Sequence, residues 1–278
     1  MNNLLGYLGP KGTYSEETAL RYSADTHLKP KPYPSFEQIF AAVEKKEIPQ
    51  AVIPVENSLQ GSVNLTFDLF AKDRPVKIRG ELLLKIRHCL MARPGQKVMQ
   101  IEEVYSHPQA LAQCRLYLDQ NMPQAARIPA SSTAEAAEFV ARDKNKALIA
   151  SDRTARLYSL EVLREDIQDK SPNVTRFLLI GLSDKPPTGS DKTSLLISLQ
   201  DRPGSLYSAL GIFARHDLNL TKIEPRPARE TLGKYIFFLD IEGHRKEKKV
   251  EQALAELKKT TLFVKVLGSY PLARQTFL

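Results

Sequence analysis

A hydroxyl and a guanidinium stand side by side at the start of an apolar segment, in the sequence SPNVTRFLLIG at residues 171–181. The apolar run 177–180 predicts a buried strand, and a buried strand has no need of an arginine at its start. A guanidinium binds a carboxylate through two parallel hydrogen bonds, so Arg176 is a candidate for holding an anionic ligand. A structural ion pair is the alternative interpretation of this arginine.

Four further segments place hydroxyl, amide or glycine residues where a strand ends and a helix is expected to begin. They are residues 9–15, 54–61, 106–114 and 129–134. A helix N-terminus carries free backbone N–H groups and the positive end of the helix dipole, which suits an anion. Each segment alone is explained by an ordinary helix cap or, at 54–61, by a capped turn. In a two-lobed α/β domain, however, such turns can face one cleft, and that cleft would be polar and suited to a carboxylate ligand.

The elements that must position these segments alternate between strands and helices over residues 1–182. Strands are expected at 4–8, 51–55, 104–105 and 147–150, and helices at 14–24, 36–45, 108–119 and 132–142. This alternation predicts an α/β domain with a mostly parallel sheet. The β-type stretch 76–91 is expected to cross between two lobes.

A segment rich in proline and polar residues, 183–191, is expected to be a linker to a second domain. Residues 192–278 then show the order strand, helix, strand, strand, helix, strand. The expected elements are 193–199, 204–215, 218–223, 235–241, 248–258 and 262–267. This order predicts a ferredoxin-like βαββαβ domain.

Length and composition narrow the class of protein. The chain has 278 residues, of which 42% are hydrophobic, enough for a sizeable core and two domains. We expect no membrane span and no signal peptide, because no apolar run of 18 residues occurs and the first residues are not basic. Cys89 and Cys114 lack metal-type spacing, which favours a reduced, cytoplasmic protein. The net charge of +8 is spread along the chain, which suits a small anionic ligand better than a nucleic acid.

Five motifs, in order, resemble the prephenate dehydratase family, and the resemblance covers nearly the whole chain. They are GPKGTYS (9–15), PVENS (54–58) with Gly61, SHPQA (106–110) continuing to Gln113 and Cys114, STA (132–134), and NVTRF (173–177). The C-terminal part resembles an ACT regulatory domain. There Gly204-Ser205-Leu206 stands where the family has Gly-Ala-Leu, and Glu224-Pro225-Arg226-Pro227 stands where it has Glu-Ser-Arg-Pro. Some family members carry an N-terminal chorismate mutase domain, and none is expected here because the first motif starts close to Gly6.

The resemblance implies a fold and an activity. The fold would be a type II periplasmic-binding-protein-like catalytic domain of two lobes at 1–182, a linker at 183–191 and an ACT domain at 192–278. The activity would be that of a carbon–oxygen lyase, converting prephenate to phenylpyruvate, water and CO2 in L-phenylalanine biosynthesis without a metal or other cofactor. Prephenate would be the substrate, L-phenylalanine an allosteric inhibitor, and the assembly a homodimer or homotetramer.

The expected site residues fall into three groups. The catalytic residues are Thr175, Glu56 and Asn57. The substrate-binding residues are Arg176, Thr13, Ser15, Ser58, Gln113, Ser132 and Thr133. The residues expected to bind L-phenylalanine are Gly204, Ser205, Leu206, Asn219, Leu220, Thr221 and Glu224.

The chemistry assigns roles within these groups. Prephenate loses a carboxylate and a hydroxyl while its ring becomes aromatic, so the enzyme must hold a dianion and help hydroxide to leave. Thr175 is expected to donate a hydrogen bond or relay a proton to the leaving oxygen, with Glu56 as a proton reservoir if burial raises its pKa. Arg176 is expected to clamp a carboxylate. Two alternatives stay open: an arogenate dehydratase, and a non-catalytic regulatory protein that binds a small anion or an amino acid on the same fold.

Overall fold

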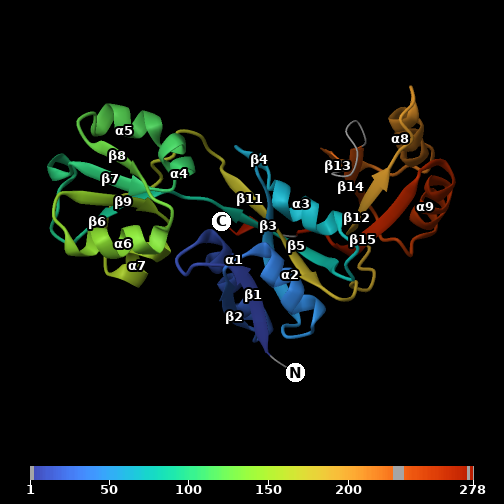
Figure 1. Cartoon of the computed structure of the whole chain (residues 1–278), viewed down its shortest axis with the longest axis horizontal. Coiled ribbons are helices and arrows are strands. Elements are labelled where there is room, and N and C mark those ends of the chain that lie inside the picture. The colour runs from blue at the N-terminus through green and yellow to red at the C-terminus, as the bar shows by residue number, and fades with distance from the viewer. Residues whose placement is uncertain (1–2, 228–234, 274–275, 278) are drawn as a thin grey trace.

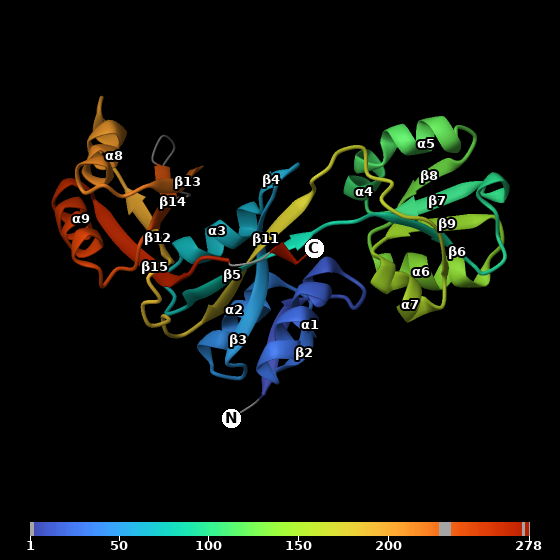
Figure 2. The ribbon, with the colours of Figure 1, turned by 180° about the vertical axis from the view of Figure 1, so that it is seen from behind.

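The computed structural model describes residues 3–227, 235–273 and 276–277, which form three β-sheets with flanking helices (Figure 1). Two sheets build the first and second lobes of the N-terminal part, and the third belongs to the C-terminal domain. The first lobe lies between the other two units in both views (Figures 1 and 2). This arrangement confirms the expected α/β class. Within the described residues, no helix combines the length and the apolar character that a membrane crossing requires.

The first lobe is built on a sheet with strand order β16-β5-β11-β3-β1-β2, and β4 pairs with β3. The strands are β1 (Leu4–Leu8), β2 (Lys29–Tyr33), β3 (Gln50–Asn57), β4 (Gly61–Ser62), β5 (Lys77–Lys85), β11 (Val174–Gly181) and β16 (Thr276–Phe277). Strand β1 is parallel to β2 and β3, whereas β11 is antiparallel to both β3 and β5. Helices α1 (Tyr14–Thr26), α2 (Phe36–Glu44) and α3 (Asn64–Ala71) pack against this sheet. Ile39, Phe40 and Ile53 are fully buried in its core.

Local sequence explains how the first elements begin and end. Helix α1 begins after Thr13, whose hydroxyl accepts the backbone N–H of Glu16, and Glu16 and Glu17 complement the dipole of the first turn. Strand β2 was not predicted, because it contains Pro30 and Pro32. It lies at the edge of the sheet, where a proline removes no ladder hydrogen bond that the sheet needs.

The second lobe is built on a sheet with strand order β10-β6-β9-β7-β8. The strands are β6 (Cys89–Ala92), β7 (Glu103–Ser106), β8 (Ala126–Pro129), β9 (Lys146–Ala150) and β10 (Glu161–Arg164). The helices are η1 (Val98–Gln100), α4 (Pro108–Gln113), α5 (Arg115–Asn121), α6 (Thr133–Arg142) and α7 (Asp152–Tyr158). The single helix expected at 108–119 is therefore two helices, which meet at Cys114.

Two chain segments connect the lobes. Residues 86–88 lead from β5 into β6, and residues 165–173 return from β10 to β11. The segments are bonded to each other, because Ile86 N–H donates to the Asn173 carbonyl at 2.7 Å and Ile167 N–H donates to the His88 carbonyl at 3.0 Å. The expectation that residues 76–91 cross between two lobes is confirmed.

The C-terminal domain has the expected βαββαβ order. Its elements are β12 (Asp191–Ser198), α8 (Ser205–Arg215), β13 (Leu220–Pro227), β14 (Tyr235–Glu242), α9 (Lys248–Thr260) and β15 (Phe263–Pro271), and its sheet order is β13-β14-β12-β15. Strand β15 packs against β5 of the first lobe (Figure 2). The contact is very close at Gly268, where an added Cβ would lie 2.1 Å from the Ile78 carbonyl oxygen. Glycine is therefore required for the two domains to meet in this way.

Candidate active site

A cavity of about 480 Å³ opens between the two lobes, a volume typical of small-molecule sites. The first lobe and its connection contribute Gly12, Thr13, Tyr14, Pro54, Asn57, Gln60, Gly61, Ser62, Val63, Ile86, His88 and Thr175. The second lobe contributes Ser106, His107, Gln109, Ala110, Gln113, Thr133, Ile149, Ala150 and Ser151. All four strand-to-helix segments singled out in the sequence are represented, which confirms that these turns face one cleft.

The lining of the cavity includes many polar side chains on a mostly apolar surface, but it carries no Asp, Glu, Lys or Arg among the residues that the structure describes. It offers hydroxyl groups, carboxamides and two imidazoles, together with an apolar part made by side chains such as Ile86, Val63 and Ile149. Helices α1 and α6 begin at the cavity, at Thr13 and Thr133. An anion in this cavity would therefore be met by hydrogen-bond donors and helix dipoles rather than by formal charges.

Thr175 and Asn57 form a hydrogen-bonded pair in this cavity. They lie opposite each other where β11 pairs with β3, and Asn57 Nδ2 donates to Thr175 Oγ1 at 2.9 Å. The orientation of the Asn57 amide is fixed, because its Oδ1 accepts the backbone N–H groups of Leu59 at 3.0 Å and Gln60 at 3.2 Å. Since Thr175 Oγ1 is the acceptor in this pair, the hydroxyl hydrogen of Thr175 is left to point at a ligand.

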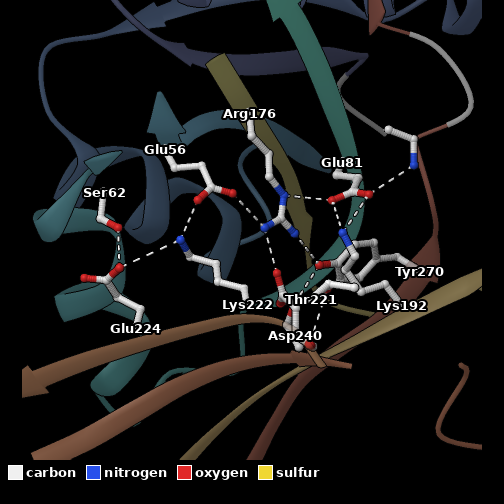
Figure 3. A network of polar contacts seen from close by, with 12 residues as sticks. Glu56, Ser62, Glu81, Arg176, Lys192, Thr221, Lys222, Glu224, Asp240 and Tyr270 are labelled. Carbon is white, nitrogen blue, oxygen red and sulfur yellow. Dashed lines mark hydrogen bonds and ion pairs between the residues drawn. The ribbon is translucent and has the colours of Figure 1, made fainter. Parts of the chain in front are cut away.

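Glu56 and Arg176 lie on the opposite face of the same two strands, because neighbouring residues of a strand point to opposite sides of its sheet. Arg176 is buried and donates to Glu81 at 2.7 Å, Glu56 at 3.2 Å and Asp240 at 2.7 Å (Figure 3). Its remaining nitrogen donates to the Tyr270 hydroxyl at 3.0 Å. Arg176 thus does not line the cavity: its guanidinium joins the first lobe to the C-terminal domain. The geometry corresponds to the alternative interpretation, a structural ion pair.

Glu56 departs from its expected role for the same reason. Its carboxylate accepts from Lys222 of the C-terminal domain as well as from Arg176 (Figure 3). Burial alone would raise the pKa of Glu56, but hydrogen bonding and charge from Lys222 and Arg176 outweigh it and lower the pKa. The expectation of a raised pKa is therefore wrong in this structure, and Glu56 is an ionised partner of the domain contact.

The other residues expected to bind substrate divide into two sets. Thr13, Gln113 and Thr133 line the cavity. Ser15, Ser58 and Ser132 do not line it. Ser15 is buried in the first turn of α1, the Ser58 hydroxyl accepts from Val174 N–H at 3.0 Å, and Ser132 caps α6. Ser58 and Ser132 thus stabilise elements that carry a lining residue, β11 and α6.

The residues expected to bind L-phenylalanine lie in three places in this chain. Ser205 and Leu206 line a small hollow of about 150 Å³ between α8 and β14, and Gly204, with φ of 81°, caps α8 beside it. Asn219 lines a second hollow beyond the other end of α8. The remaining three lie along β13: Leu220 packs against the domain core, the Thr221 hydroxyl donates to the Asp240 carbonyl, and the Glu224 carboxylate accepts from the Ser62 hydroxyl of the first lobe.

Several residues with polar contacts at the cavity were not among the expected site residues, and three of them are bonded to one another or to expected residues. They are His88, Asn173 and Tyr14: His88 and Tyr14 line the cavity, and the Asn173 carboxamide bonds to both Asn57 and Gln113. The sequence signal for Asn173 was the motif 173–177 itself and for Tyr14 the motif 9–15, whereas His88 follows several charged residues in 76–91 and had no comparable signal.

Two family profiles match the chain. The family described as "Prephenate dehydratase" matches residues 5–185, and the one described as "ACT domain" matches residues 193–259.

Known proteins show the same likeness along the whole chain. The chain is 45% identical over 271 residues to the bifunctional chorismate mutase/prephenate dehydratase of Aquifex aeolicus. The alignment covers 97% of this chain and 74% of that protein. It is 40% identical over 278 residues to the prephenate dehydratase of Methanocaldococcus jannaschii, and that alignment covers 98% of this chain and 99% of that protein. The crystal structure of prephenate dehydratase from Arthrobacter aurescens in complex with L-Phe superimposes with a TM-score of 0.89 at 35% identity, covering 96% of this chain and 90% of that one.

Proposed function

This chain belongs to the prephenate dehydratase family, and from that premise we propose that the cavity between its lobes is where prephenate is decarboxylated and dehydrated. The activity is that of a carbon–oxygen lyase in L-phenylalanine biosynthesis, with phenylpyruvate, water and CO2 as products. The cavity has the volume for one such molecule, and its lining has both an apolar part for the ring and donors for two carboxylates.

The substrate carboxylates are bound without an arginine. Arg176 is occupied on the far side of the sheet, so the N-termini of α1 and α6, with the Gln113 carboxamide, receive the negative charge. The Thr13 hydroxyl caps α1 and donates to the Pro10 carbonyl, so it shapes this end of the cavity without a hydrogen to spare. Donors that are already in place need little reorganisation when charge moves during the reaction. A cavity without formal positive charge also holds the leaving carboxylate less tightly, which favours its release as neutral CO2.

Thr175 assists the departure of the ring hydroxyl. As the bond from the ring to the carboxylate carbon breaks, its electron pair moves into the ring and the carbon–oxygen bond to the hydroxyl breaks. The Thr175 hydroxyl donates a hydrogen bond to the leaving oxygen, which takes up a proton from solvent to become water. Glu56 has no part in this step, because it lies on the opposite face of β3.

The observation that carries this assignment is the hydrogen bond from Asn57 Nδ2 to Thr175 Oγ1, which leaves the threonine hydrogen free for the cavity. Thr175→Val should lower kcat about 10²–10³-fold, the effect of losing one donor to a developing anion. Equilibrium dialysis should show that prephenate still binds, and Thr175→Ser should keep most of the activity. Turnover of prephenate and arogenate by the wild type, measured side by side, decides between the two dehydratases. A Thr175→Val variant with normal kcat would remove Thr175 from the mechanism.

Regulation by L-phenylalanine is assigned to the C-terminal domain. The hollow beside Ser205 and Leu206 would receive the amino acid, with its carboxylate at the N-terminus of α8. The domain contact reaches Arg176, one residue from Thr175, so a shift of the C-terminal domain would be felt on β11 with a coupling of about 1–3 kcal/mol. Leu206→Glu should raise the L-phenylalanine concentration for half inhibition at least about tenfold, through like-charge repulsion. An unchanged inhibition curve would place the effector elsewhere.

The assembly is assigned from the free edge of the C-terminal sheet. Strand β13 is an edge strand, and an edge strand readily pairs with another copy. A dimer or tetramer formed there would also bring Asn219 of one copy closer to the hollow of another. Light scattering of the purified chain tests this, and a monomer at assay concentration would contradict it. A cytoplasmic location of the protein accords with its two buried free cysteines, because free thiols persist in a reducing compartment.

A further inference from the structure

A continuous series of side-chain hydrogen bonds runs from Thr175 across the connection between the lobes. Asn57 Nδ2 contacts Thr175 Oγ1 at 2.9 Å and Asn173 Oδ1 at 2.7 Å. Asn173 Nδ2 then contacts Gln113 Oε1 at 3.0 Å, and the same oxygen contacts His88 Nε2 at 2.7 Å. The last contact joins His88 Nδ1 and the Tyr14 hydroxyl at 3.1 Å. The series joins both lobes, because Gln113 belongs to α4 while Asn57 and Thr175 belong to the first sheet.

The directions of the first four bonds, from Thr175 to His88, are set by two backbone groups. The contact of the Tyr14 hydroxyl with His88 Nδ1 carries no such direction, because the same hydroxyl donates to the Arg87 carbonyl at 2.7 Å. The N–H groups of Leu59 and Gln60 donate to Asn57 Oδ1, and a backbone N–H cannot act as an acceptor. Asn57 must then present its NH2 group to Asn173 Oδ1, and Asn173 must present its own NH2 group to Gln113. The Gln113 oxygen is therefore the acceptor in its bond to Asn173.

The partner of Gln113 on its other side must also be a donor. Gln113 Oε1 carries no hydrogen, so the hydrogen of the 2.7 Å contact belongs to His88 Nε2. With its oxygen held by two donors, Gln113 turns its NH2 group away from both, and Gln113 lines the cavity. The same series thus presents two donors to a ligand, the Gln113 amide and the Thr175 hydroxyl.

His88 is well placed to hold this geometry. It lies on the first connecting segment and is 4% exposed. Its backbone N–H donates to Gln168 Oε1 at 2.9 Å and its carbonyl accepts from Ile167, both on the second connecting segment. Burial lowers the pKa of the His88 imidazole, so near pH 7 the ring is neutral and has one N–H to give.

We infer that His88, as the neutral Nε2–H tautomer, is a positioning residue for the dehydration of prephenate: it fixes the Gln113 carboxamide so that its NH2 group meets a substrate oxygen. This inference rests on the proposed function of the cavity. It assigns no direct contact between His88 and the reacting atoms, because the imidazole acts through Gln113.

The first test compares two substitutions at position 88. His88→Phe removes the donor at similar volume, and kcat should fall about 10- to 100-fold, the effect of a misplaced polar group. His88→Gln keeps an N–H near the Nε2 position and should recover most of the loss. His216→Gln, in the C-terminal domain, is the control and should match the wild type. Equal loss in His88→Phe and His88→Gln, with both folded by circular dichroism, would overturn the inference.

The second test asks whether His88 acts through Gln113. In a Gln113→Leu background, His88→Phe should cost little further activity, because the group that it positions is already gone. A merely structural role for His88 would lower the activity by the same factor in both backgrounds, and that result would overturn the inference.

The third test needs no turnover, so it separates this inference from the proposed function. The nitrogen chemical shifts of the imidazoles in the labelled chain, which has five histidines, report the tautomer of each ring. We expect His88 to be the Nε2–H tautomer and its Nε2–H signal to move in Gln113→Leu. An Nδ1–H tautomer would overturn the inference even if prephenate is turned over. A wild type that forms the expected tautomer but leaves prephenate unchanged would instead refute the proposed function alone.

Discussion

Removing the charge of Asp240 should loosen the contact between the catalytic and C-terminal domains. Four buried charged groups meet there: Arg176, Lys192, Glu81 and Asp240, with side-chain exposures of 8%, 10%, 5% and 0% (Figure 3). Two are cations and two are anions, so the group is neutral. In Asp240→Asn the amide keeps the shape and can still accept from Arg176, so the substitution removes mainly the charge.

The expected cost follows from the charge that is left over. One buried positive charge becomes uncompensated, and breaking a buried pair in this way typically costs about 3–5 kcal/mol. Arg176 keeps Glu81 and Glu56 as partners, so we expect the lower end, about 3 kcal/mol of unfolding free energy. The control is Glu138→Gln, which removes half of an exposed pair with Arg142 and should leave stability nearly unchanged.

The assay is urea unfolding of the whole chain, followed by far-ultraviolet circular dichroism and by tyrosine fluorescence, since the chain has no tryptophan. Two probes are needed because the domains can unfold separately. The double variant Arg176→Met/Asp240→Asn leaves the balanced pair Lys192–Glu81, so it should lose less than the sum of its two single variants. L-Phenylalanine should also inhibit Asp240→Asn less completely. The reasoning is refuted if Asp240→Asn unfolds like Glu138→Gln, or if the double variant is additive.

Three more predictions address the same molecule. Gly268→Ala should disrupt the packing of β15 on β5 and cost about 1–3 kcal/mol, because its Cβ would strike the Ile78 backbone. Gly80→Ala on β5, whose added Cβ would meet nothing nearer than 3.7 Å, is the matched control, and equal proteolytic sensitivity of the two variants would contradict the close contact. The pKa of Glu81 is lowered from 4.5, since Arg176 and Lys192 outweigh the opposing effect of burial, so its contribution to stability is present above pH 4.5 and is lost as the pH falls through the lowered pKa. The stability difference between wild type and Glu81→Gln should therefore shrink in acid, and a constant difference would contradict this. Activity should survive exhaustive treatment with EDTA, and a loss restored by one divalent ion would reveal a metal requirement.

The strand pattern explains which part of the site could be predicted. Thr175 and Asn57 were expected at the site and line the cavity, while their neighbours Arg176 and Glu56 were expected there too and lie on the other face. The alternation of side chains along a strand already forbids adjacent residues from sharing one face. Which member of each pair faces the ligand depends on the pairing of β3 with β11 across the fold, and the sequence does not state that pairing.

Contacts between the domains could not be predicted from the sequence, for a related reason. Arg176 carries the features of a carboxylate clamp, and it does bind carboxylates, but one of them is Asp240 of another domain. No local pattern indicates how the C-terminal sheet docks on the first lobe. Helix caps, in contrast, depend on neighbours in sequence, which is why residues 9–15 and 129–134 could be recognised as helix starts, and the structure has Thr13 and Ser132 as the caps there.

The position of β11 determines the order in which the newly made chain can fold. This strand, residues 174–181, lies between β3 and β5 in the first sheet, but the ribosome makes it only after the whole second lobe. Until it emerges, β3 and β5 each present an unpaired edge, of the kind that invites association with other chains. The second lobe is continuous in sequence from β6 to β10 and can fold first. Its folding brings residue 164 back toward residue 89, so that β11 is delivered beside the strands it must join. Thr175, near the start of this strand, is thus put in place by the completion of the lobe that faces it.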